Sequence, residues 1–296
     1  MLAAVVLATG AITAVESVSA APSAVAAESP EDFRSPTTVD LLSRGAKPRD
    51  RLRLASAAGS TVVGALRHDI ASKQTVSGIE EPTGPQTVTA DRRTTVMSVG
   101  RDGVRTISFT YENASAPELN GFGGTYAVTD RGFEGNVKLA YPAGTDTETQ
   151  GALQQLETQF STLSAAFPYA AVGVGARWKV TRRFSGDGLA FTHSVVYELV
   201  ERDDNHIVLR SKVRQTAPEQ PVDLSGIPDT ATATLVASEG VGAGDLDLDL
   251  NEVLPIVATV LSRVDDVIQI EQGAQQIRIA ETVTTNISIT SARSGA

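Results

Sequence analysis

The chain carries a similar extended pattern twice, and this repeat constrains its fold more than any other feature. Gly45-Ala46 precedes a run from Arg49 to Leu54, and Gly175-Ala176 precedes a run from Arg177 to Phe184. Two further matches follow in the same order: the turns 99–103 and 200–204, and then the segments 126–132 and 234–240. Three loose matches in one order indicate a duplicated β-rich unit.

Strand periodicity is clearest from Thr87 onward. Asp102-Gly103 suits a tight turn with positive φ, so we expect a hairpin around it and a second one around residues 203–205. The expected hairpin strands are 87–99 with 104–111, and 189–200 with 206–215. The last stretch is a strand with one buried face, because its apolar residues share one parity: Ile277, Ile279, Val283, Ile287 and Ile289.

Other segments are less regular. We expect an edge strand at 39–42, a strand at 50–54, and a strand with a long loop between Ser56 and Pro85. The glycines of 240–244 indicate a turn with little steric bulk. Residues 256–270 are β-branched and suit either a strand or a helix.

One segment breaks the β pattern and predicts a helix between the two copies. Thr145 and Glu148 form a capping box, in which each side chain bonds a backbone amide of the first turn. Behind them apolar residues recur at three- and four-residue spacing until Pro168: Leu153, Leu156, Phe160, Leu163 and Phe167. Antiparallel strands with one apolar face must wrap around something, and this helix is the expected partner.

These patterns predict a β-rich α+β fold. We expect two related antiparallel β units, as a curved sheet or half-barrel, with one linking amphipathic helix. The predicted organisation is a signal peptide at 1–27, a tether at 28–38, a first β repeat at 39–144, the linking helix at 145–168 and a second β repeat at 169–296.

The N-terminal residues indicate export. Leu2 to Val15 is apolar and is followed by small-residue runs with A-x-A-like cleavage sites, the last of them at Ala27. No Lys or Arg precedes Arg34, so either the signal is atypical or the start codon lies upstream. The apolar run is too short to span a bilayer comfortably. We therefore expect a secreted or cell-envelope protein in an extracytoplasmic compartment, without a stable membrane span.

Composition excludes several functions. The chain has no cysteine, which excludes disulfides, thiolate metal sites and a cysteine nucleophile. Its formal net charge of −10 argues against nucleic acid and anionic lipid headgroups as general partners. His68, His193 and His206 lie in no metal-binding spacing, and neither a G-x-S-x-G elbow nor a P-loop occurs. We expect no enzymatic activity, no cofactor and no metal, and the oligomeric state stays open.

Asp245, Asp247 and Asp249 are the weak candidates for a metal site, because they share one face of an expected strand over 245–250. Their oxygens suit Ca²⁺. Strand geometry separates alternate side chains by about 6.5–7 Å, too far to hold one ion without a bend. A solvated outer face is the favoured interpretation.

Other candidates for ligand binding have equally simple structural explanations. Arg92-Arg93 and Arg182-Arg183 suit either an acidic ligand or the separation of strand edges. The weak apolar candidates are the helix stripe and the one tryptophan: Leu153, Leu156, Phe160, Leu163, Phe167 and Trp178. Both a cavity for an apolar ligand and a filled core fit these residues.

The segment 172–180, Val-Gly-Val-Gly-Ala-Arg-Trp-Lys-Val, preceded by Phe167-Pro168, resembles a recurring segment in a family of secreted proteins and lipoproteins of unknown function, mainly actinobacterial. The resemblance includes 253–255 and, more weakly, 45–53. The motif looks structural, and the resemblance implies no activity or catalytic residue. The chain departs from the lipoproteins of this family because it lacks the cysteine.

Three functions are compatible with these patterns. The leading hypothesis is a non-enzymatic envelope protein that binds an apolar or amphipathic ligand such as a lipid, by analogy with envelope lipid carriers whose sheets curl around a helix. The second is a structural or protein-interaction module with a filled core, and the third is a hydrolase of unrecognised type. A cavity favours the first, an unprotected edge or apolar patch the second, and a buried group with a perturbed pKa in a cleft the third.

Overall fold

The computed structural model describes residues 37–77, 79–160, 163–186, 189–222, 224, 227–228 and 230–291. The expected signal peptide and all but the last two residues of the expected tether lie outside these residues. Among the described residues, no helix is both long and apolar enough to cross a membrane. The elements in chain order are β1 (Thr38–Arg44), β2 (Thr61–Val76), β3 (Ile79–Val99), β4 (Arg105–Glu112), the 3₁₀ turn η1 (Pro117–Leu119), β5 (Gly123–Val128), β6 (Glu134–Ala140), α1 (Thr147–Phe160), β7 (Ala176–Gly186), β8 (Leu189–Asp203), β9 (His206–Ala217), β10 (Gln220–Val222), β11 (Thr232–Asp249), β12 (Val257–Gln272) and β13 (Gln275–Ser291).

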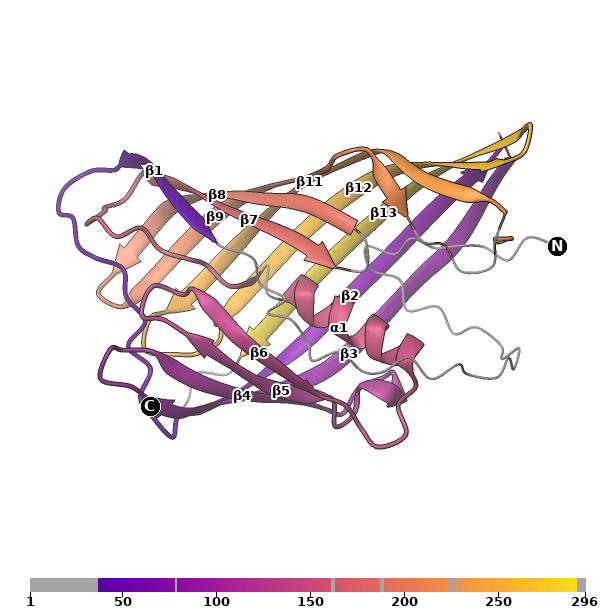
Figure 1. The fold of residues 1–296 in the computed structure, drawn as a ribbon. Coiled ribbons are helices and arrows are strands. Elements are labelled where there is room, and N and C mark those ends of the chain that lie inside the picture. The colour runs from indigo at the N-terminus through magenta and orange to yellow at the C-terminus, as the bar shows by residue number, and fades with distance from the viewer. Residues whose placement is uncertain are drawn as a thin grey trace.

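The described strands form one antiparallel sheet. Its strand order is β1-β7-β8-β9-β11-β12-β13-β2-β3-β4-β5-β6, and the short β10 pairs with β11 beside this path. Figure 1 shows the sheet curling, with α1 on the inside of the curve. The prediction of a β-rich fold with antiparallel strands is confirmed, and the structure shows these strands in one large open sheet.

The chain segments before and after α1 share this one sheet. β2 to β6 are neighbours in chain order, as are β7, β8, β9, β11, β12 and β13. Two long-range pairings join these runs, because β13 lies beside β2 and β1 lies beside β7. β1 thus extends the sheet of the later segment although it belongs to the earlier one. The repeat boundaries at 39–144 and 169–296 stay a prediction.

Both predicted hairpins form. The turn between β3 and β4 contains Gly103 with φ 78°, and the turn between β8 and β9 contains Asp204 with φ 48°. Glycine adopts this left-handed conformation at no steric cost, and aspartate tolerates it. The predicted edge strand at 39–42 is β1, and the predicted one-sided strand at the end is β13.

The prediction of a strand at 50–54 is wrong. Residues 45–60 form an irregular connection with one isolated bridge, between Asp50 and Val172. The cause is a close crossing of two backbones: a Cβ on Gly173 would lie 2.0 Å from the carbonyl oxygen of Ala46, and one on Gly45 would lie 2.2 Å from that of Gly173. Gly45 and Gly173 therefore let two connections touch each other, whereas a Cβ on Gly175 would have no atom within 4 Å.

Two other expectations are corrected and one open alternative is settled. In place of the long loop expected before Pro85, β2 and β3 form a hairpin closed by Val76 and Ile79. The turn expected at 240–244 is part of β11, which pairs with β9 and β12 along this stretch. Residues 257–270 belong to the strand β12, and Ile256 directly precedes it. A central strand has backbone partners on both sides, and these outweigh the preference of glycine for turns.

The predicted helix is α1, but both of its ends differ from the prediction. Its N-cap is Asp146, whose Oδ1 accepts a hydrogen bond of 2.8 Å from the amide of Thr149. The capping box predicted at Thr145 is wrong by one residue, because the carboxylate of Asp146 caps the first turn instead. The described helix ends at Phe160 and does not continue to Pro168.

Two buried apolar clusters line the inside of the curved sheet. The larger, which we call the helix cluster, joins α1 to the sheet and includes Phe109, Tyr111 and Trp178. The smaller, which we call the far cluster, lies at the other end of the long strands: Val222, Leu224, Ala233, Leu235, Ile268, Ile270 and Ile279. The inner face between them holds the candidate site.

Candidate functional site

Four neighbouring strands, β11, β12, β13 and β2, line the inner face between the two clusters. We call their inward positions there the middle band. Opposite residues of an antiparallel pair share a face, so the register fixes its members: His68, Ile70, Ser72 and Gln74 from β2; Glu281, Val283 and Thr285 from β13; Ser262, Val264 and Asp266 from β12; Ser238, Gly240, Gly242 and Gly244 from β11. The band thus places polar side chains between two apolar clusters.

Several polar groups of the middle band are buried without a hydrogen-bond partner. His68 is 1% exposed, Asp266 is 6% exposed and Glu281 is 4% exposed. Neither ring nitrogen of His68, neither carboxylate oxygen of Glu281, nor Oδ1 of Asp266 has a partner. Buried polar groups in native proteins nearly always have one. The band is therefore incomplete as a protein interior.

Asp266 and Glu281 stand directly opposite each other on β12 and β13, and we call them the acidic pair. Burial and repulsion from Asp266 raise the pKa of Glu281 to about 7. Burial also raises the pKa of Asp266, against a hydrogen bond with Ser238 that lowers it. Two buried carboxylates side by side resist being charged together, so the pair holds a proton more readily than ordinary carboxylates do.

β11 contributes three glycines, and so no side chains, to one part of the middle band: Gly240, Gly242 and Gly244. A Cβ on Gly242 would lie 2.7 Å from the carbonyl oxygen of Leu261, and one on Gly244 would lie 2.3 Å from that of Thr259. Glycine inside a strand often marks a place where another group approaches closely. The stretch predicted as a turn with little steric bulk is instead the part of the band without side chains.

The three histidines occupy separate places in the sheet. Burial lowers the pKa of His68 to about 4. His193, on β8, is buried beside Arg182, and burial with this neighbouring charge lowers its pKa to about 4. His206 begins β9, and its Nε2 lies 2.6 Å from Oδ1 of Asp247. The two buried histidines are therefore neutral at pH 7.

The six apolar residues predicted as weak ligand-binding candidates all lie in the helix cluster, each at most 5% exposed: Leu153, Leu156, Phe160, Leu163, Phe167 and Trp178. Nε1 of Trp178 donates to the carbonyl oxygen of Ala166 at 2.8 Å. Two cavities beside this cluster have volumes of about 30 and 50 Å³. Such volumes hold a water or two, whereas small-molecule sites start at about 300 Å³. Ligand binding by these six residues stays a prediction.

A buried ion pair fastens α1 to the sheet. Arg92 of β3 donates two hydrogen bonds to the carboxylate of Glu157 of α1, at 2.5 and 3.1 Å. Tyr111 of β4 donates to the same carboxylate at 2.9 Å. Burial works against the charge of Arg92, but the attraction of Glu157 leaves its pKa well above the ordinary value. The guanidinium also lies 4.1 Å from the ring centre of Phe109, so a buried cation is balanced by its neighbours.

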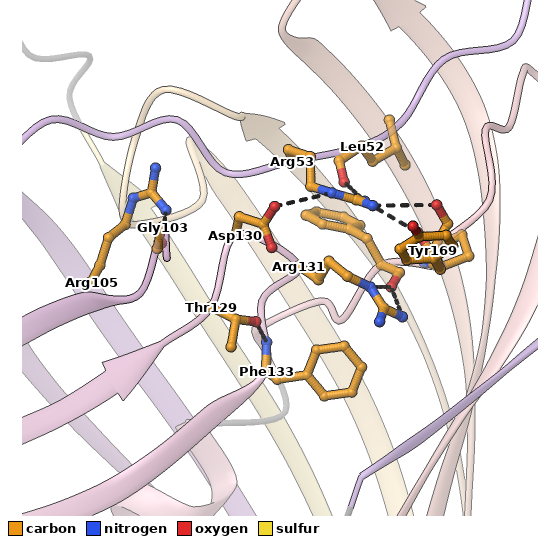
Figure 2. A network of polar contacts seen from close by, with 11 residues as sticks. Leu52, Arg53, Gly103, Arg105, Thr129, Asp130, Arg131, Phe133 and Tyr169 are labelled. Atoms are coloured by element: carbon orange, nitrogen blue, oxygen red, sulfur yellow. Dashed lines mark hydrogen bonds and ion pairs between the residues drawn. The ribbon is translucent and has the colours of Figure 1, made fainter. Parts of the chain in front are cut away.

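A second arginine network holds the connection between α1 and β7 (Figure 2). Arg53 forms an ion pair of 3.1 Å with Asp130 and donates to the carbonyl oxygens of Leu52 and Tyr169 at 2.6 and 3.2 Å. Arg131 donates to the carbonyl oxygen of Phe167 at 2.9 Å, and the amide of Phe167 donates back to the carbonyl of Arg131. These bonds replace the helical ones and explain why 164–168 is not helical. The guanidinium groups act here as structural ties.

The predicted arginine pairs are divided between the two faces of the sheet. Arg92 points inward, while Arg93 is exposed and pairs with Glu112 at 3.0 Å. Arg182 is half-buried and Arg183 is exposed. Adjacent residues of a strand point in opposite directions, so neither pair can hold one anion with both side chains.

Asp245, Asp247 and Asp249 also have separate surroundings. The first lies 3.7 Å from Nε of Arg210, the second contacts His206, and the third accepts a backbone amide hydrogen bond of 2.9 Å. The described residues contain no group of three or more His, Cys, Asp or Glu that could hold a metal ion.

The acidic pair escaped the sequence survey although one signal for it is present. Glu281 falls on the same parity as Ile277, Ile279 and Val283, which marks it as a charged residue on a buried face. Asp266 stands beside Asp265, and the sequence does not reveal which of these two points inward.

A comparison of the chain with known protein families and with curated proteins finds no match.

Proposed function

We propose that this chain is a non-enzymatic binding protein of the cell envelope whose ligand is apolar or amphipathic. The observation that carries the proposal is the middle band, with its buried and unpartnered nitrogen and oxygen atoms on His68, Asp266 and Glu281. A self-sufficient core would have paired these groups or replaced them by apolar ones. A bound molecule that lies along the band would complete it.

The apolar residues of the band support a ligand with an apolar part. Ile70 is 4% exposed and Val283 is 1% exposed, yet neither belongs to the helix cluster or the far cluster. Ile70 lies in the same row across the strands as Gly242, and Val283 lies in the same row as Gly240. Binding sites for small molecules typically combine apolar walls with a few polar groups.

The location and ancestry in this proposal rest on the sequence. An apolar leader with small-residue cleavage sites, together with the lack of cysteine, supports an extracytoplasmic, cell-envelope protein. The glycine motifs at 45–46 and 173–176 support membership of the secreted actinobacterial family that they resemble. They also support an origin of the two β units by duplication, with α1 as the link between them.

A second candidate is a structural or protein-interaction module. The observation in its favour is the packing of the helix cluster, since the cavities beside it measure only about 30 and 50 Å³. On this alternative the helix-covered part of the inner face is a filled core, and partners bind elsewhere.

The hydrolase alternative has less support, because Glu281, the buried carboxylate with a raised pKa, lines neither of the two cavities, and no histidine lies within reach of the acidic pair. His68 lies six positions along β2 from Gln74, the residue opposite Glu281, which corresponds to about 20 Å. His193 lies three strands from β12, or about 14 Å at ordinary strand spacing. A general base must come within about 3 Å of its proton, or reach it through one water.

Native mass spectrometry of the protein, purified without detergent, tests the binding proposal. We expect a bound mass that disappears on denaturation and extracts into organic solvent. A clean apo mass, unchanged after incubation with lipid extract of the host, would contradict the proposal and favour the interaction module.

A matched pair of variants locates the ligand. Thr285→Phe places a ring in the middle band, whereas Thr284→Phe places it on the outer face of the same strand. We expect the first variant to lose the bound mass and the second to keep it. Equal retention by both variants would place any ligand outside the band.

A further inference from the structure

The acidic pair forms one site because of its register. Asp266 and Glu281 are direct partners on neighbouring antiparallel strands, and both side chains are buried on the inner face. Residues in this relation have Cβ atoms about 4.5–5.5 Å apart. Their carboxylates therefore face one shared space, next to Ser238 of β11 and Gln74 of β2.

The site has unused hydrogen-bond acceptors. Ser238 bonds to Asp266, but Oδ1 of Asp266 and both oxygens of Glu281 have no partner. A buried carboxylate without a partner is costly, and a neighbouring carboxylate increases that cost. Three free acceptor oxygens in one buried space are the complement of a group that carries a positive charge and several N–H donors.

Among the residues that the structure describes, none supplies such a group to this part of the fold. None of the middle-band residues is Lys or Arg. The neighbouring cations Lys73, Arg263 and Arg278 are exposed. Arg182 points inward, but it lies on β7, on the far side of β11, β9 and β8 from β12.

The surroundings of the pair define the rest of the ligand. On one side of the pair, the next inward residues of β12 and β13 are Ile268 and Ile279 of the far cluster. On the other side, toward the helix cluster, the next inward residues are Val264 and Val283. A molecule that fits this row needs one cationic end and an apolar body.

We propose that the acidic pair binds the ammonium group of a cationic amphiphile whose apolar part lies along the middle band. This rests on the proposed function and deepens it by naming the ligand class. The ammonium group, with three N–H donors, bonds the free oxygens of Glu281 and Asp266. Its single positive charge offsets one of the two negative charges, so the pair holds a proton less readily with the ligand bound than without it. The raised pKa of Glu281 agrees with this assignment, because a bound cation stabilises the ionised carboxylate and lowers that pKa.

Three probes of equal chain length test the assignment on the full-length protein: dodecylamine, dodecanol and dodecanoate, with calorimetry below their aggregation limits at pH 7.5. We expect dodecylamine to bind about 10- to 100-fold more tightly than dodecanol, as charge-assisted hydrogen bonds allow. Dodecanoate should bind most weakly of the three. Equal affinity for all three would overturn the ammonium site and leave the binding function intact. No binding of any probe would overturn both proposals.

Variants separate the site from the general negative charge of the protein. Glu281→Gln and Asp266→Asn should each remove most of the preference for dodecylamine over dodecanol. Glu239→Gln changes the net charge equally on the exposed face and should preserve the preference. Unchanged dodecanol binding by the variants confirms that the band is still folded. A preference that falls equally in Glu239→Gln would overturn the proposal.

Calcium distinguishes an ammonium site from a metal site. Two carboxylates and a hydroxyl are fewer than the six to eight oxygens that Ca²⁺ usually takes. We therefore expect millimolar Ca²⁺ to leave the binding of dodecylamine unchanged. Displacement of dodecylamine by Ca²⁺ from the wild type, but not from Glu281→Gln, would overturn the amine assignment in favour of a metal ion.

Discussion

Under α1, the guanidinium of Arg92 meets the carboxylate of Glu157, while in the middle band the carboxylates of Asp266 and Glu281 meet each other. Both groups are buried on the same face of one sheet. In the first region a helix of the chain itself supplies the counter-charge. In the second region no side chain of the band does so. The difference teaches that α1 supplies a counter-charge to only one of the two buried groups, and that the acidic pair lowers its charge by holding a proton instead.

The largest effect should come from removing the counter-charge under α1. Glu157→Ala leaves Arg92 buried and uncompensated, and the loss of one partner of a buried pair costs about 3–5 kcal/mol. We expect the free energy of unfolding in urea to fall by about that amount. Glu112→Ala removes a carboxylate that pairs with the exposed Arg93 and should leave it nearly unchanged. Similar losses in both variants would show that burial does not distinguish the two pairs.

Removing a charge from the acidic pair should raise the free energy of unfolding at neutral pH instead of lowering it. The folded-state pKa of Glu281, about 7, lies above the ordinary value of 4.5, so its contribution to stability is present below pH 4.5 and lost as the pH rises through 7. At about 1.4 kcal/mol per pKa unit, the wild type should lose roughly 3 kcal/mol relative to Glu281→Gln over this window. Urea unfolding of both proteins from pH 4.5 to 8 measures the difference. A gap that does not widen with pH would contradict the raised pKa.

The smallest effect at neutral pH should come from the unpartnered histidine of the band. His68→Leu replaces a buried neutral ring without partners, so the stability at pH 7.5 should change by no more than about 1 kcal/mol. The folded-state pKa of His68, about 4, lies below 6.5, so the wild type should lose stability as the pH falls from 6.5 to 4. Thermal unfolding should show a variant that resists acid better than the wild type. A large loss at pH 7.5 would instead indicate a hidden structural role of the ring.

The sequence predicts local features of this fold well, because they depend on nearby residues. Asp102-Gly103 predicts its hairpin, and the shared parity of Ile277 to Ile289 predicts a strand with one buried face. The alternation of residues 50–54 wrongly predicts a strand. The contact of Gly173 with Ala46, which prevents it, joins residues far apart in the chain. Gly240 to Gly244 mislead in the same way, because β9 and β12 supply the partners that make them a strand.

The candidate site depends on pairings that no local pattern contains. Asp266 meets Glu281 only because β12 and β13 pair in one register, and Gln74 joins them only because β13 also pairs with β2. A shift of one residue in either register would turn these side chains to opposite faces. The sequence shows that Glu281 shares the buried face of its strand, but it does not show that Asp266 lies opposite.

The position of β13 beside β2 also governs how the protein can be made. Gly64 of β2 pairs with Ser291 of β13, so the strands β2 to β6 keep one unpaired edge until β13 has been synthesised. An unpaired strand edge invites association with other chains, and contacts between distant residues form slowly. The β2 edge of a nascent chain therefore stays open to other chains until β13 emerges, and a truncation that removes β13 should increase aggregation.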